Sequence, residues 1–122
     1  MILGRSDSGV GIFTRGLIRA LGRHDRENQY LIYHGLDSGE VDTAGAANVQ
    51  AVRVPVRNGI RPRRIAWEQL QLPSRLKRDQ VELLHAPAYV HPVLVDVPTV
   101  VTVHDLFALT HPHLCKRLNV LH

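Results

Sequence analysis

The sequence has little cysteine and few aromatic residues, and each shortage excludes a class of protein. Its 122 residues include one cysteine, Cys115, so no disulfide can form within the chain. Aromatic side chains make up 5% of the residues, which argues against a surface on which nucleic-acid bases stack. No apolar run approaches the ~20 residues that a membrane-spanning helix needs. Disulfide-stapled, nucleic-acid-binding and membrane-spanning proteins are therefore disfavoured.

What the sequence does contain is typical of one globular domain. Hydrophobic residues make up 44% and charged residues 21%, and a chain of this length can bury a core. The formal net charge of +4 suits an anionic partner such as a phosphorylated substrate or a lipid headgroup. No nucleic-acid motif is present, so no nucleic-acid partner is expected. Since no signal sequence is visible, a cytoplasmic location is predicted, with peripheral contact at the inner face of an anionic membrane left open.

Short apolar runs alternate with amphipathic stretches along the whole chain. This pattern is typical of βαβ units and predicts one α/β domain over residues 1–122, Rossmann-like, with a mostly parallel sheet flanked by helices. Strands are predicted at residues 1–3, 30–33, 49–54, 83–85 and 99–103. The last of these is β-branched throughout, so it is expected to be buried on both faces.

Helices are predicted over residues 10–21 and 65–78, with the start of another at 112–122. Gly22 is expected to end the first helix. Its predicted apolar face consists of Val10, Phe13, Leu17 and Leu21. The segment 65–78 contains Pro73, which predicts a kink or two short helices with this proline in the first turn of the second. Loops are expected at residues 5–11, 36–48, 57–64 and 86–96.

Small and polar residues follow the predicted strands, at the edge where open α/β sheets bind ligands. Gly9 and Gly11 open the first helix, where backbone amides favour a phosphate group, although a plain tight turn explains them too. His104 follows the last strand and is a candidate hydrogen-bond donor or base, with Asp105 to orient it. Both residues could instead satisfy loop backbone groups. His85 ends the strand before, at the same edge.

Arginines form two clusters in the sequence, and each cluster is explained either by solvent exposure or by binding to an anionic partner. The first, at residues 15, 19 and 23, suits a solvated helix face or contact with an anionic membrane. The second comprises Arg57, Arg61, Arg63 and Arg64. It suits an anionic acceptor, for which Arg61 and Arg64 are the chosen candidates, or solubility alone. The histidines at 104, 111 and 113 match no zinc pattern, so no metal site is expected.

Four segments, in order and spacing, resemble the family 4 (group 1) glycosyltransferases of the GT-B fold. Residues 9–17, GVGIFTRGL, resemble the family's "GIGRYTREL"-like helix opening, and residues 67–73, WEQLQLP, resemble its "W-x-Q-x-x-L-P" segment. Residues 84–87, LHAP, resemble its "L-H-x-P" turn. Residues 98–106, PTVVTVHDL, resemble its "P-x-V-V-T-V-H-D-L" strand and turn. Together these segments extend over nearly the whole chain.

The resemblance implies one lobe of a retaining enzyme that moves a mannosyl- or rhamnosyl-like sugar from a nucleoside diphosphate to an acceptor hydroxyl. This lobe would shape the acceptor side, for a carbohydrate or lipid-linked acceptor. Gly9 and Gly11 would lie near the donor diphosphate, His104 near the transferred sugar, and Asp105 would support it. The acceptor-binding candidates are His85, with the two arginines named above. No metal and no cofactor beyond the nucleotide-sugar donor is implied.

Two departures from the family pattern limit this expectation. The first strand is nearly absent, and no segment resembles the second lobe, which grips the donor. The isolated chain is therefore expected to have little or no transferase activity. A non-catalytic module that binds an anion, a sugar or a partner is the alternative. A dinucleotide-binding domain is disfavoured because the G-x-G-x-x-G fingerprint is missing and the second strand ends at Tyr33-His34 without an acidic residue.

Overall fold

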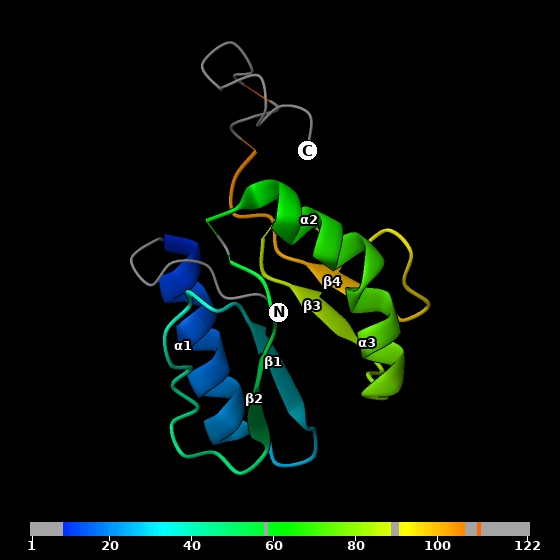
Figure 1. Cartoon of the computed structure of the whole chain (residues 1–122). Coiled ribbons are helices and arrows are strands. Elements are labelled where there is room, and N and C mark those ends of the chain that lie inside the picture. The colour runs from blue at the N-terminus through cyan, green and yellow to red at the C-terminus, as the bar shows by residue number, and fades with distance from the viewer. Residues whose placement is uncertain (1–8, 58, 89–90, 107–109, 111–122) are drawn as a thin grey trace.

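Along the chain, one helix precedes a pair of short parallel strands, and two helices precede a second pair (Figure 1). The computed structural model describes residues 9–57, 59–88, 91–106 and 110. The elements are α1 (Gly9–His24), β1 (Tyr30–His34), β2 (Val49–Arg53), α2 (Arg61–Leu70), α3 (Leu72–Arg78), β3 (Leu84–Ala86) and β4 (Thr99–Val101). The predicted strand at 1–3 and helix at 112–122 lie outside the described residues. Among the described residues, no helix has the length and apolar character to cross a bilayer.

The strands form two parallel pairs. Strand β1 pairs with β2, with Tyr30 opposite Val49, and β3 pairs with β4, with Leu84 opposite Thr99. In Figure 1, α1 lies beside the β1–β2 pair, and α2 and α3 follow one another alongside β3 and β4. The prediction of a mixed α/β chain with parallel strands and helices is confirmed, but the single predicted sheet is wrong: no ladder of hydrogen bonds joins the described strands of one pair to those of the other, so they form two two-stranded sheets.

The core lies on both faces of β1, because alternate side chains of a strand point to opposite sides. Tyr33 belongs to the larger cluster, with Val54 and Val56 after β2, Trp67, Leu72 and Leu76 of α2 and α3, and Leu84 of β3. Ile32 belongs to the smaller cluster, with Ile18 of α1 and Val49 of β2. Strand β1 is thus packed between α1 on one side and the α2–α3 segment on the other.

The first helix differs from its prediction in its end and in its buried face. It continues through Gly22 to His24, so the prediction that Gly22 ends it is wrong. Its buried residues are Gly11, Thr14, Ile18 and Gly22 rather than the larger apolar residues expected. A Cβ at Gly22 would lie 2.7 Å from the Cβ of Ala46. This glycine therefore lets the helix approach the loop before β2 closely.

The predicted break at Pro73 is confirmed. Helix α2 ends at Leu70 and α3 begins at Leu72, with Pro73 in its first turn. Proline has no backbone N–H, so position 73 cannot donate to the carbonyl of residue 69 and the helix divides there. The predicted loop 57–64 is partly wrong, since α2 begins at Arg61 and takes up three of the four clustered arginines.

Strand β4 is shorter and more exposed than predicted. It ends at Val101, although the amide of Thr102 still donates to the carbonyl of Ala86 at 2.9 Å. Val100 is 50% exposed and Val103 is 53% exposed, so the expectation of burial on both faces is wrong. β-Branched side chains favour the extended backbone whether or not a neighbour covers them.

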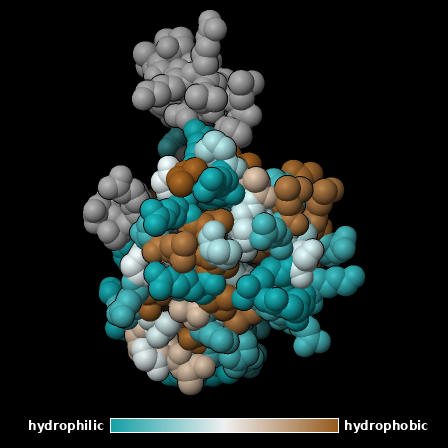
Figure 2. Space-filling view, in the orientation of Figure 1, coloured by the Kyte–Doolittle hydropathy of each residue, from teal (hydrophilic) through white to brown (hydrophobic). Residues whose placement is uncertain are grey.

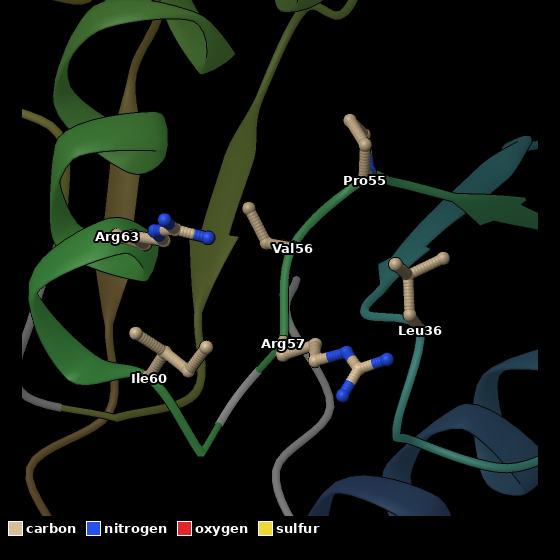
Figure 3. Close-up of a pocket in the computed structure, with 6 residues that line it drawn as sticks. All are labelled: Leu36, Pro55, Val56, Arg57, Ile60 and Arg63. Atoms are coloured by element: carbon tan, nitrogen blue, oxygen red, sulfur yellow. The ribbon is translucent and has the colours of Figure 1, made fainter.

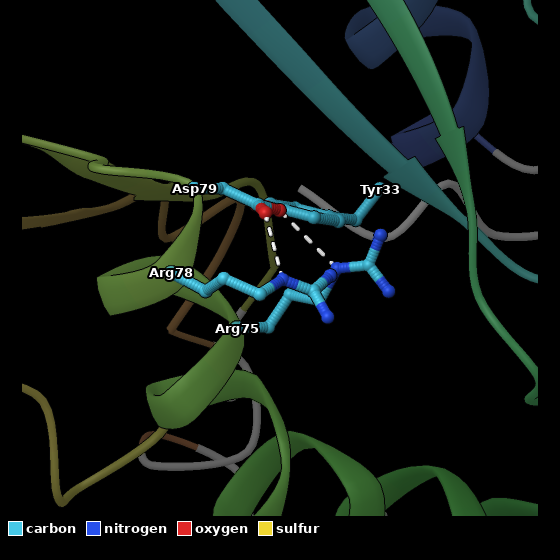
Figure 4. A network of polar contacts seen from close by, with 4 residues as sticks. All are labelled: Tyr33, Arg75, Arg78 and Asp79. Atoms are coloured by element: carbon cyan, nitrogen blue, oxygen red, sulfur yellow. Dashed lines mark hydrogen bonds and ion pairs between the residues drawn. The ribbon is translucent and has the colours of Figure 1, made fainter.

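A polar network joins β1 to the end of α3 (Figure 4). The hydroxyl of Tyr33 donates to Asp79 Oδ2 at 2.8 Å, and Arg75 Nε donates to the same oxygen at 3.2 Å. Arg78 Nε reaches the other carboxylate oxygen at 3.3 Å. Burial and the neighbouring Asp79 raise the pKa of Tyr33, which keeps its hydroxyl protonated as a donor. The network ties residues 46 positions apart.

Candidate functional site

Two histidines lie where β3 and β4 end. Nε2 of His85 lies 2.8 Å from Oγ1 of Thr102, and Nε2 of His104 lies 2.7 Å from the carbonyl oxygen of Pro87. A carbonyl can only accept, so Nε2 of His104 carries the proton and donates it to this contact. In the neutral ring Nδ1 is then the acceptor nitrogen. The His85 contact joins β3 itself to the chain after β4, and the His104 contact joins the chain after β4 to the chain after β3.

The start of α1 contacts this strand-end site through Phe13. The rings of Phe13 and His104 meet edge to face, with centroids 5.1 Å apart and planes at 84°. Phe13 was expected in the apolar core, yet it is 43% exposed and packs against a site residue instead. The sequence analysis therefore did not predict Phe13 as a site residue, and its contact with the His104 ring identifies it as one.

The two glycines of the predicted phosphate loop lie inside α1. Gly9 is the first residue of the helix and Gly11 is buried two positions later, so the expected loop 5–11 does not extend as far as Gly11. Both glycines lie in the first turn of α1. A Cβ on Gly9 would meet no atom within 4 Å. Close approach to the rest of the chain therefore does not explain a glycine there.

Burial alters the acidity of the strand-end site. It lowers the pKa of His85, so this ring favours its neutral form. Asp105 is exposed and follows His104 directly. A neutral imidazole can both donate and accept, which suits hydrogen bonding to a sugar hydroxyl. The structure thus brings His85, His104 and Phe13 together, at the end of one strand pair.

The predicted acceptor arginines occupy different surroundings. Arg61, the first residue of α2, is exposed. Arg64 faces inward, with Nε 3.6 Å from Oε1 of the buried Glu68. Burial raises the pKa of Glu68, and Arg64 acts against that rise. Arg64 therefore offsets a buried carboxylate, and its position is set by this pairing.

A second concave site lies at the other strand pair, beyond the carboxyl ends of β1 and β2 (Figure 3). It is a pocket of about 360 Å³. Its lining residues are Leu36, Pro55, Val56, Arg57, Ile60 and Arg63. The two arginines belong to the cluster found in the sequence, but neither was chosen as a candidate. Their selection depends on where α2 begins, which the sequence did not reveal.

The arginines of α1 lie on its outer side. Arg19 and Asp42 form an ion pair in which both side chains are about half exposed. A pair this exposed contributes about 0–1 kcal/mol to stability. Among the described residues, no group of three or more histidine, cysteine, aspartate and glutamate side chains is placed to hold a metal ion.

Apolar side chains also reach the surface next to α2 (Figure 2). Leu70, Val93 and Leu94 are each more than 70% exposed. Gln69 holds the neighbouring loop from both ends of its amide. Its Nε2 donates to the carbonyl of His91 at 3.0 Å, and its Oε1 accepts from the amide of Val93 at 2.9 Å.

Comparisons of this chain with protein-family models, with curated proteins and with solved structures give no match. The functional argument therefore rests on the sequence pattern and on the two sites at the strand ends.

Proposed function

We propose that this chain is the acceptor-side lobe of a retaining glycosyltransferase that uses a nucleoside diphosphate sugar. The observation that carries the proposal is the position of His104. Its ring lies just past the end of a parallel strand, between the Pro87 carbonyl and the ring of Phe13. Ligands of open α/β folds bind beyond this end of the strands. The four motif-like segments of the sequence support the same assignment.

In this proposal His104 binds the transferred sugar. The contact of Nε2 with Pro87 orients the ring, and the imidazole hydrogen-bonds a hydroxyl of the sugar. Asp105 supports the turn that holds the ring. During transfer the bond from the anomeric carbon to the diphosphate breaks and a bond to the acceptor oxygen forms. The acceptor hydroxyl gives its proton to the departing diphosphate oxygen, and the nucleoside diphosphate leaves.

The remaining predicted residues take supporting roles. Gly9 and Gly11 lie in the first turn of α1, where backbone amides suit the donor diphosphate. His85 and Arg61 face the acceptor, which is a carbohydrate or a lipid-linked sugar. A second lobe supplies the main grip on the donor, so the isolated chain has little transferase activity. The proposed location is the cytoplasm, with peripheral contact at an anionic membrane.

The test assays the longest polypeptide encoded by the reading frame that contains this chain. Release of nucleoside diphosphate is measured with GDP-mannose, dTDP-rhamnose and UDP-glucose, and the anomeric configuration of the product is read by NMR. We expect release from at least one donor with retained configuration. His104→Ala should lower turnover about a hundredfold, because it removes a contact to the reacting sugar.

His91→Ala is the matched control, since His91 is exposed and its ring contacts the carbonyl of the adjacent Pro92. It should leave turnover unchanged. Absence of release from every donor would overturn the transferase proposal and favour a non-catalytic binding module. A His104→Ala protein as active as the wild type would remove His104 from the mechanism.

A further inference from the structure

The pocket beyond β1 and β2 is built by segments that the fold holds firmly. The amide of Leu36 donates to the carbonyl of Val56 at 2.7 Å, so the two chains stay paired past the strand ends. Arg53 Nη2 also donates to the carbonyl of Leu36 at 3.2 Å. Val56 is buried in the larger core cluster. The floor of the pocket is therefore anchored to the core.

The charge at the pocket mouth is positive. Arg57 and Arg63 line it, and neither guanidinium has an ion pair or a hydrogen bond among the described residues. The first turn of α2, which carries Arg63, contains no acidic residue. The carboxylate of Asp37, which follows Leu36, accepts a hydrogen bond at Oδ2 from the amide of Gly59 at 3.1 Å. Two arginines at one opening suit a phosphate or carboxylate group.

The rest of the lining is apolar. In Figure 3, Val56 lies between the two arginines, Ile60 lies on the side of Arg63, and Leu36 lies on the side of Arg57. Leu36 and Ile60 are each more than 40% exposed. An apolar group laid on them would remove that surface from water, which is favourable at about 25 cal/mol per Å². A volume of about 360 Å³ lies in the range of small-molecule sites.

We propose that this pocket binds a phosphate monoester that carries a short apolar group. The phosphate lies between Arg57 and Arg63, and the apolar group contacts Leu36, Val56 and Ile60. Under the proposed function this ligand is the anionic end of the acceptor, and that reading rests on the transferase proposal. Binding to the pocket does not, since it requires only the described lobe.

The test measures binding to the chain itself by isothermal titration calorimetry, with three probes below micelle-forming concentrations. n-Octyl phosphate has both features, inorganic phosphate only the charge, and n-octyl glucoside only the apolar group. We expect n-octyl phosphate to bind at least tenfold more tightly than either of the others. Equal affinity for n-octyl phosphate and inorganic phosphate would overturn the apolar part of the site, and no binding of n-octyl phosphate would overturn the proposal.

Variants distinguish a pocket from a general attraction by the +4 chain. Arg57→Gln and Arg63→Gln should each weaken n-octyl phosphate binding about tenfold, because each removes a charge-assisted hydrogen bond. Arg26→Gln is the control: it removes the same charge before β1, at the end opposite the pocket. Equal weakening in all three variants would show that binding follows net charge alone.

The thermal midpoint of each variant verifies that it folds. Arg57 and Arg63 are exposed and outside the core clusters, so neither change should alter stability. This experiment and the donor assay fail independently. Binding of n-octyl phosphate without any sugar transfer keeps the pocket and removes the transferase. Sugar transfer without binding of n-octyl phosphate keeps the transferase proposal and removes the pocket proposal.

Discussion

The edge of the Phe13 ring and the ring of His104 meet at 84°, with centroids 5.1 Å apart. This contact joins the first helical turn to the turn after the last described strand, 91 positions later by residue number. Edge-to-face aromatic pairs contribute about 0.5–1.5 kcal/mol beyond the area they bury. Together with the Pro87 carbonyl, Phe13 therefore fixes the plane in which the His104 ring lies.

Replacing Phe13 by leucine should loosen His104 without unfolding the chain. Phe13 is partly exposed and belongs to neither core cluster, so the thermal midpoint should change little. The chemical shifts of the His104 ring protons should change in NMR spectra, because these protons lose the ring current of Phe13. In the longer polypeptide, turnover should fall about three- to tenfold.

Ile12→Ala is the matched control for Phe13→Leu, since Ile12 is the adjacent residue and is more exposed. It should leave both the His104 resonances and turnover unchanged. If Phe13→Leu leaves the His104 resonances in place, the ring contact does not position the histidine.

The hydroxyl of Tyr33 should contribute measurably to stability, since it donates to Asp79 from a buried ring. Tyr33→Phe removes the hydrogen bond and leaves Asp79 with its two arginines. The free energy of unfolding should fall by about 1–2 kcal/mol, measured by urea denaturation. Tyr30→Phe is the control, because its hydroxyl donates to Asp25, a carboxylate near the surface. A larger loss in Tyr30→Phe than in Tyr33→Phe would contradict the importance of the network.

Gly16 and Gly22 of α1 should respond to substitution by alanine in opposite directions. Gly22→Ala places a Cβ 2.7 Å from that of Ala46 and 3.2 Å from Cγ2 of Val49, so it should destabilise the fold by about 1–3 kcal/mol. At Gly16 a Cβ meets nothing within 4 Å. Gly16→Ala should therefore stabilise by about 0.5–1 kcal/mol through helix propensity. Urea denaturation of both variants measures these changes in the free energy of unfolding. If Gly22→Ala stabilised the fold, the close packing of Gly22 against Ala46 would be refuted.

Stability should fall in mildly acidic solution. Burial lowers the pKa of His34 and of His85, and Arg53 adds to the effect at His34. The unfolded chain then takes up protons at about pH 6.5, before the native state does. The stabilising effect of these neutral rings is complete above that pH and is lost as the pH falls through the lower native values.

His34→Gln should make the thermal midpoint less sensitive to pH between about 6.5 and 5, since it removes one of the two groups. His24→Gln, on the exposed last turn of α1, is the control and should leave the profile as it is. Glu68 acts in the opposite sense, because its raised pKa favours the native state as the pH falls toward its ordinary range. An unchanged profile in His34→Gln would show that His34 does not contribute.

The sequence predicted which segments are helical or extended better than it predicted which faces are buried. Hydrophobic periodicity located α1, and the missing N–H of Pro73 located the division between α2 and α3. Periodicity treats a large apolar side chain as a core residue, however. In α1 the buried Gly22 permits close approach, whereas Phe13 contacts His104. Such choices depend on partners distant in the chain.

The candidate sites show the same division. His85 and His104 were found because residues after parallel strands gather at one edge. Phe13 was missed because nothing local marks an aromatic ring as the neighbour of a distant histidine. Arg57 and Arg63 were seen only as members of a basic cluster. Arg57 and Arg63 line the same pocket because α2 begins at Arg61. A cluster of charges in the sequence does not indicate where that helix begins.

The side-chain amide of Gln69 forms the same pair of hydrogen bonds as a residue of a neighbouring β-strand. It donates to the carbonyl of His91 and accepts from the amide of Val93. The backbone of the loop after β3 is thus held while the side chain of Val93 stands in water. Val93 thus has a solvent-exposed side chain but a hydrogen-bonded main-chain amide. The Val93 amide should exchange its hydrogen with solvent only when this part of α2 opens, so its exchange rate reports the local free energy of that opening.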